Sequence, residues 1–111
     1  MSSALTKLDR RLIPFAERLV QIARDVGLSP VITSTRRSRV LQARLYRSWL
    51  RGERSLPAAA PGTSLHEHGL AIDLVVNDPD AYRELGALWQ RWGGEWGGES
   101  DPVHFQARGL L

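Results

Sequence analysis

The chain has 111 residues, a net charge of +3 and no cysteine, with 42% hydrophobic and 24% charged residues. This length leaves room for a single domain, residues 1–111, and the composition is that of a folded globular protein. Without cysteine, disulfides and thiolate metal ligands are excluded, so any zinc must be held by His, Asp or Glu. The sequence has no run of 18 apolar residues and no apolar segment after Met1, so we expect neither a membrane span nor a secretory signal.

The N-terminal part of the chain predicts a helix followed by a strand. Apolar residues at three- and four-residue spacing indicate an amphipathic helix up to Val26. Pro14 requires that this helix either begins near Leu12, with the proline in its first turn, or kinks there. Gly27 is the expected stop. The β-branched run 30–35 follows a turn signal and is typical of a strand.

A second helix and a long loop are expected next. Ser38 is the predicted N-cap of the helix, and Gly52 is its predicted end. Residues 53–65 contain two prolines, three alanines and a Pro-Gly pair, which indicates a loop. The pattern predicts that one stripe of the helix is buried: Leu41, Leu45 and Trp49.

The second half of the chain predicts a strand, a helix and a final pair of strands. Residues 70–76 form an apolar run that reads as a strand buried on both faces. Asp78 is the expected N-cap of the third helix, with Pro79 at its first position, and two glycines stop it at residues 93 and 94. Residues 95–98 and 103–106 are expected as short strands. The fold class is therefore α+β, a small mainly antiparallel sheet with three helices packed against it.

The apolar strand contains one residue that needs explanation, Asp73. A buried carboxylate costs several kcal/mol unless it is paired or binds a metal. A catalytic zinc takes three protein ligands and one open position, and His66, Asp73 and His104 supply a His2Asp set. The zincin motif is excluded because position 70 is Leu. We expect His68 to be a bystander that faces solvent or lines the pocket rim.

A hydrolytic zinc site also needs a general base, and the sequence offers three candidates. Asp101 lies three residues before His104, while Glu95 and Glu99 each follow a pair of glycines nearby. Spacing alone does not choose among them. Arg37 is the best candidate for a fixed positive charge that holds a substrate carboxylate or stabilises an oxyanion, although the sequence alone slightly favours a surface salt bridge.

Four motifs occur in a fixed order between Thr33 and Gln106. They are Arg37-Ser38-x-x-x-Gln42-x-x-Leu45-Tyr46, Ser64-x-His66-x-x-Gly69-x-Ala71-x-Asp73, Trp92-Gly93-Gly94-Glu95-Trp96 and Asp101-x-x-His104-Phe105. With this order and spacing the chain resembles the zinc peptidases of the Hedgehog/D-Ala-D-Ala peptidase superfamily. These include VanY-type D-alanyl-D-alanine carboxypeptidases and the L-alanyl-D-glutamate endopeptidases of phage endolysins.

The resemblance implies a role for each matching residue. One Zn2+ per chain is expected at His66, Asp73 and His104, and the general base is expected at Asp101, ahead of Glu95 and Glu99. Catalysis and substrate binding would involve Arg37, and the other substrate-binding residues would be Ser64 and Gln42. The chain departs from the family before the arginine, where Thr35-Arg36 replaces the usual aromatic residue.

The resemblance also implies a function, a zinc-dependent peptidase acting on peptidoglycan stem peptides. The small size and an Asp as the base favour an L-Ala-D-Glu endopeptidase over a D-alanyl-D-alanine carboxypeptidase. A non-catalytic zinc-containing cell-wall-binding module of the same fold is the alternative from another class. We expect a monomer that is made in the cytoplasm and acts on the wall after holin release or phage-tail delivery.

Seven arginines lie between residues 36 and 54. Such a cluster is compatible with nucleic-acid binding, with a solvated helix face, or with attraction to an anionic polymer such as the bacterial wall. The solvated face is the preferred interpretation, and no nucleic-acid partner is expected, because nucleic-acid binding leaves the buried Asp73 unexplained.

Overall fold

The computed structural model describes residues 4–108. Two 3-10 turns, three α-helices and four strands follow one another along the part of the chain that is described. Their bounds are η1 (Leu5–Lys7), α1 (Ile13–Asp25), β1 (Val31–Ser34), α2 (Arg39–Leu50), η2 (Leu65–His68), β2 (Ala71–Val75), α3 (Ala81–Arg91), β3 (Glu95–Trp96) and β4 (His104–Gln106).

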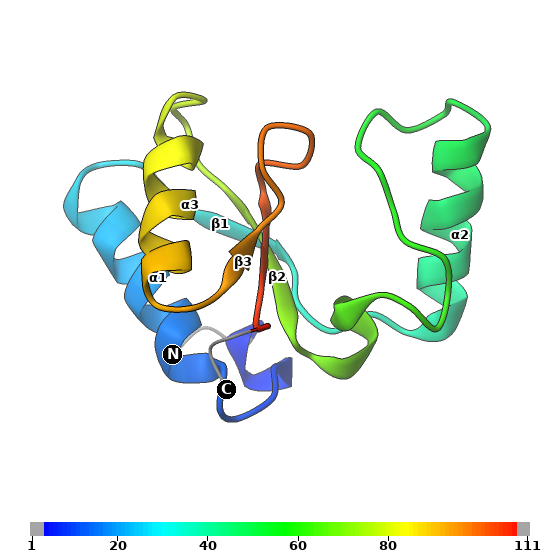
Figure 1. Ribbon diagram of the computed structural model, residues 1–111, viewed down its shortest axis with the longest axis horizontal. Helices are drawn as coiled ribbons and strands as arrows, with labels where there is room; N and C mark the ends of the chain where they lie inside the picture. Colours follow the sequence, from blue (N-terminus) through cyan, green and yellow to red (C-terminus); the bar gives the residue numbers. More distant parts are fainter. Residues whose placement is uncertain (1–3, 109–111) are drawn as a thin grey trace.

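The strands form one antiparallel sheet in the order β1-β2-β4-β3. Together with three α-helices this confirms the predicted α+β class. Side chains alternate between the two faces of a strand, so β2 directs Ile72 and Leu74 to one face and Asp73 to the other. In Figure 1, α1 and α3 lie together on one side of the sheet and α2 stands on the other.

The face towards α1 and α3 carries the hydrophobic core. Ile72 and Leu74 of β2 and Phe105 of β4 are fully buried against residues of the two helices, among them Leu19 and Trp89. The rings of Trp89 and Phe105 meet edge to face with centroids 5.8 Å apart. Burying each such large side chain contributes roughly 1.5–3 kcal/mol. Packing on this face therefore holds the strands in register, and that register positions the side chains on the opposite face, where Asp73 lies.

The ends of α1 agree with one of the two predicted alternatives. The helix begins after Leu12, and Pro14 lies in its first turn, where its missing N–H costs nothing. Gly27 adopts a φ of 81° just beyond the last turn, as expected of a residue that ends a helix. Within residues 4–108, no helix combines the length and the apolarity needed to cross a bilayer.

The predicted packing of α2 is wrong. The cap is as expected, since Ser38 Oγ accepts a hydrogen bond from the N–H of Leu41 at 3.1 Å. However, Leu41 and Trp49 are 42% and 39% exposed, and the helix buries only Gln42 completely. The reason is that the core is completed by α1 and α3, so α2 packs through a polar contact to the functional site described below.

The predicted start of α3 is also shifted. The N-cap is Asp80, and Pro79 precedes the helix. Asp78 acts one turn earlier, where its Oδ1 accepts a hydrogen bond from the N–H of Asp80 at 3.0 Å and its carbonyl accepts one from Ala81. Asp-x-Asp therefore forms a turn that leads into the helix, and a turn and a cap share the same residue preferences.

Candidate metal centre

The register of the sheet places Asp73 and His104 side by side. Asp73 of β2 is the direct partner of His104 on β4 and of Ser34 on β1, where the β1 register shifts. Direct cross-strand partners share a face, which here is the face turned away from α1 and α3. Ala71 on the same face of β2 pairs with Gln106. The two-residue alternation of side chains thus brings Ser34, Asp73 and His104 together from distant parts of the sequence.

His66 reaches the same place from the turn before β2. Ser64 caps η2, and its Oγ accepts a hydrogen bond from the His66 N–H at 3.2 Å. Gly69 ends the turn with a φ of 70°, and a Cβ there would lie only 2.9 Å from the backbone nitrogen of Asp9, so the position needs glycine. Two hydrogen bonds fix His66 to the end of β1: its carbonyl accepts from the Arg37 N–H, and its Nδ1 lies 2.8 Å from the Thr35 carbonyl.

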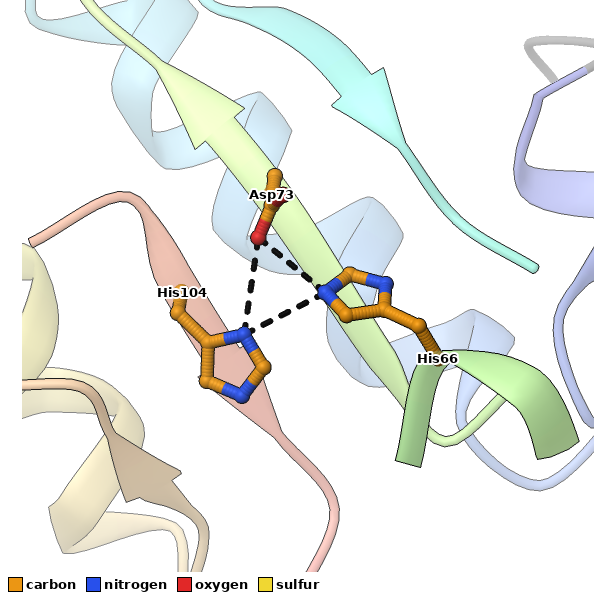
Figure 2. A group of neighbouring side chains, drawn as sticks. All are labelled: His66, Asp73 and His104. Atoms are coloured by element: carbon orange, nitrogen blue, oxygen red, sulfur yellow. Dashed lines mark hydrogen bonds and ion pairs between the residues drawn. The ribbon is translucent and has the colours of Figure 1, made fainter. Parts of the chain in front are cut away.

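The three predicted ligands converge (Figure 2). His66 Nε2 lies 3.1 Å from Asp73 Oδ1, and His104 Nδ1 lies 3.5 Å from the same oxygen. The two ring nitrogens are 3.2 Å apart. One ligand atom from each residue therefore lies within 4.8 Å of the others, as required to hold a single metal ion.

The hydrogen bonds around the histidines aim two lone pairs at this point. The Thr35 carbonyl can only accept, so His66 Nδ1 is the donor and Nε2 of the neutral ring faces Asp73 as an acceptor. His104 Nε2 lies 2.7 Å from Gln106 Oε1 and donates to it, which leaves Nδ1 as an acceptor. Two imidazole lone pairs and a carboxylate facing one another without a donor suit a cation, and His2Asp is a donor set that zinc accepts.

A proton can occupy this position in place of a metal. Burial lowers the pKa of His104, but hydrogen bonds to Asp73 and Gln106 outweigh burial and raise that pKa above its usual value. When the histidines are protonated, Asp73 shows the converse: burial raises its pKa, yet hydrogen bonds from both histidines and the charges of His66 and Arg37 hold the pKa well below its usual value. The carboxylate is therefore ionised and ready to bind a cation.

Gln106 and Glu95 fix the orientation of His104. Gln106 Nε2 donates to Glu95 Oε1 at 3.0 Å, and since a carboxylate only accepts, the amide oxygen must face His104. Glu95 is also ion-paired with Arg108 at 3.3 Å. Of the two rival bases, Glu95 thus orients Gln106, which in turn orients the predicted ligand His104. Gln106 was not predicted, although it lies two residues after His104 on the same face of the strand.

We expect Gln106→Ala to weaken zinc binding by about 10–100-fold, because a metal-bound histidine that loses the acceptor of its other N–H loses orientation and basicity. The measurement is a competition titration against a chromophoric chelator. Gln106→Glu keeps an acceptor and should retain most of the affinity, and Gln90→Ala on the exposed face of α3 is the control. Unchanged affinity in Gln106→Ala would contradict this assignment.

Arg37 is buried beneath Asp73 and is held from three sides. Its Nε donates to Ser34 Oγ at 2.9 Å, one terminal nitrogen donates to Gln42 Oε1 at 3.2 Å, and the other donates to Asp73 Oδ2 at 2.5 Å. Gln42 in turn donates to the Ala59 carbonyl at 2.8 Å, which ties α2 to the following loop. Arg37 thus holds Oδ2 of Asp73 and leaves Oδ1 facing the two histidine rings. Its predicted role towards substrate stays a prediction.

Asp101 is the free carboxylate beside the three ligands. Within residues 4–108 no side chain or N–H makes a hydrogen bond or ion pair with it, whereas Glu99 is paired with Arg83 at the surface. Burial raises the pKa of Asp101, the charge of His104 opposes this, and that of Asp73 adds to it. Gly97 permits the tight approach, because a Cβ there would collide with the Asp101 carbonyl. A half-buried carboxylate with a raised pKa suits a general base.

The three predicted ligands and Asp101 line a pocket of about 350 Å³. Its walls include the predicted substrate-binding residues Ser64, Gln42 and Arg37, and also two residues that were not predicted, Trp49 and Arg54. Arg54 is half-buried, and its Nε donates to the Leu56 carbonyl at 2.9 Å. No carboxylate among the described residues pairs with it. Arg54 lies in a loop that carries no periodicity, so no sequence pattern distinguishes it from the other six arginines of residues 36–54.

His68 lies outside the metal group and is exposed, in agreement with its predicted role as a bystander. Arg36, which replaces an aromatic residue of the related family, is also exposed and does not line the pocket of the metal centre.

Comparison with known proteins gives two kinds of match. The profile of the family described as VanY, D-alanyl-D-alanine carboxypeptidase, matches residues 5–93. The match includes His66 and Asp73 but ends before Asp101 and His104. No curated protein matches the chain.

Several solved structures share the fold. One is a variant of the vancomycin resistance D,D-pentapeptidase VanY from a VanB-type cassette, in complex with Zn(II): TM-score 0.68, 21% identity, covering 93% of this chain and 74% of that one. Another is the LD-carboxypeptidase LdcB, with a TM-score of 0.70, 20% identity and coverages of 93% and 66%. A third is the L-Ala D-Glu endopeptidase ChiX of Serratia marcescens, with a TM-score of 0.57, 22% identity and coverages of 93% and 82%.

Proposed function

We propose, since this chain belongs to the VanY family of D-alanyl-D-alanine carboxypeptidases, that it hydrolyses a stem-peptide bond of peptidoglycan that precedes a D-amino acid. The observation that carries the proposal is the presence, in one pocket, of the His66–Asp73–His104 group and the unpaired carboxylate of Asp101. L-Ala–D-Glu is the bond that we place first, because the base is Asp and the chain spans 82% of the endopeptidase ChiX. The family's description favours a second candidate, D-Ala–D-Ala.

The chemistry divides between a bound ion and the chain. His66, Asp73 and His104 would hold a zinc ion, which would supply Lewis acidity to the scissile carbonyl and the attacking water. Asp101 accepts a proton from that water as the new C–O bond forms, and returns it to the leaving amine as the C–N bond breaks. Arg37 keeps Asp73 ionised and in place during both steps, through its 2.5 Å contact with Oδ2.

Arg54 is the proposed anchor for the substrate's charge. In both candidate bonds the residue after the scissile bond carries a free α-carboxylate: D-Glu, because it continues through its γ-carboxyl group, and the terminal D-Ala. Arg37 has each of its three nitrogens engaged by the protein, whereas the two terminal nitrogens of Arg54 make no hydrogen bond to the described residues. Arginine binds carboxylates through paired N–H donors, so Arg54 suits this task.

Arg54→Gln is therefore expected to raise KM about tenfold with little change in kcat, the pattern of a lost substrate contact. The test uses a soluble stem peptide and the same peptide with its α-carboxylate amidated. If Arg54 binds this group, the substitution should have no further effect on the amidated peptide. Arg24→Gln on the exposed side of α1 is the control, and an equal KM change on both peptides would contradict the assignment.

The experiment that tests the function is digestion of purified muropeptides by the zinc-loaded chain, followed by mass spectrometry. Cleavage of L-Ala–D-Glu separates the stem from the glycan-linked alanine, whereas carboxypeptidase action removes one alanine. Either fragment identifies the bond. If no wall type gives a new fragment while zinc is bound, the chain is a zinc-containing binding module of the same fold.

A further inference from the structure

The positive charge of this chain is confined to one segment. Residues 36–54 contain seven arginines and one acidic residue, Glu53. Eight of the fifteen basic residues and eleven of the twelve acidic residues lie elsewhere, so the rest of the chain carries a net charge of −3. The net charge of +3 is therefore the sum of one strongly basic segment and an otherwise acidic protein.

Four of these arginines share one face of α2 and its last turn. At 3.6 residues per turn they fall within an arc of about 140° around the helix axis. All four are exposed. We define them as the arginine face: Arg39, Arg44, Arg47 and Arg51. Gln42 and Trp49, which line the pocket of the metal centre, lie on the opposite side of the same helix.

The arginine face is not neutralised by the protein. α2 contains no acidic residue, and within residues 4–108 the single ion pair of the arginine face joins Arg51, just after the helix, to Glu53 at 4.0 Å. Arg44, Arg47 and Arg51 are spaced by three and four residues, and like charges at this spacing destabilise a helix. The helix also adds no residue to the hydrophobic core. Neither the charges of α2 nor its exposed side contributes to the stability of the fold.

We propose that the arginine face docks the enzyme onto peptidoglycan by binding carboxylates of stem peptides other than the one being cleaved. This inference rests on the proposed function, which supplies the occupant, since the polymer cut in the pocket presents an anionic group in every repeat. A helix with its side chains is about 10–12 Å across, so the arginine face and the pocket lie within reach of neighbouring stems. Several weak contacts to one polymer add up through their high effective concentration.

The test is co-sedimentation of the full chain with purified peptidoglycan that has been stripped of wall-linked phosphate polymers, over a series of salt concentrations. The triple variant R44Q/R47Q/R51Q should bind about tenfold more weakly at low salt, and its binding should depend less on salt than that of the wild type. The matched control is R10Q/R24Q/R91Q, which removes the same charge from exposed arginines elsewhere and should bind as the wild type does. Equal losses in both variants would overturn the proposal.

The choice of occupant is tested separately. When the carboxylates of peptidoglycan are converted to amides, the wild type should lose affinity. Its binding to the amidated polymer should be no tighter than the binding of the triple variant to the untreated polymer. Equal binding of the wild type to amidated and untreated peptidoglycan would overturn the proposal. So would tighter binding of the wild type to a DNA duplex, to vesicles with one-third phosphatidylglycerol, or to wall that retains phosphate polymers than to the stripped peptidoglycan. Turnover of a soluble stem peptide should be unchanged in the triple variant. If the wild type binds in this manner but cleaves no peptide, docking stands and the proposed catalysis fails.

Discussion

Asp101→Asn should retain bound zinc and lose about 10²–10⁴-fold in turnover, the range associated with removal of a general base. The substitution keeps the shape of the side chain and the turn in which the Asp101 carbonyl accepts a hydrogen bond from the His104 N–H at 3.1 Å. It removes only the group that accepts a proton. The measurements are kcat on a soluble stem peptide and zinc content by elemental mass spectrometry of the same sample.

The controls for Asp101 are the two other carboxylates near the site. Glu99→Gln should be close to wild type, because its carboxylate is paired with Arg83 at the surface. Glu95→Gln should act mainly on zinc affinity, through Gln106. A near-wild-type rate for Asp101→Asn would assign the proton transfer to another group, and whichever of the two control variants lost turnover with zinc bound would identify it.

The parts of the site that lie on regular structure could be predicted from the sequence. The apolar run around Asp73 predicts a buried strand, and a buried carboxylate predicts compensation by a cation. Family membership confirms the predicted class of enzyme, and the converging ligands confirm that these residues can hold one metal ion. The roles of the individual site residues, the monomeric state and the route to the wall stay predictions.

The parts that were missed or wrong depend on which face of an element is covered. Leu41 and Trp49 have the spacing of a core stripe, but periodicity does not reveal that α1 and α3 already complete the core. The same limit hides Arg54, whose position depends on the path of a loop without a repeating pattern. Gln106 could have been predicted, because a strand that directs His104 to one face directs Gln106 to the same face.

Asp73→Ala is expected to reduce zinc affinity by far more than the roughly 100-fold upper range of supporting residues, since it removes a direct ligand. It also leaves Arg37, which is 9% exposed, without its carboxylate. Breaking a buried pair from one side costs about 3–5 kcal/mol of stability. Zinc content and chemical denaturation of the metal-free proteins measure the two effects. His66→Ala should lose zinc with a smaller loss of stability, because Arg37 and Asp73 remain paired.

The double variant Arg37→Leu/Asp73→Leu separates the two effects of Asp73. Replacing both members of a buried pair by apolar side chains is often neutral for stability, so the double variant should be more stable than Asp73→Ala. It should still bind no zinc, since no carboxylate remains between the histidines. Full zinc content in Asp73→Ala or His66→Ala would show that the ligand set is wrong. Zinc loss in both, with stability restored only in the double variant, would establish Asp73 as the residue that links the metal to the fold.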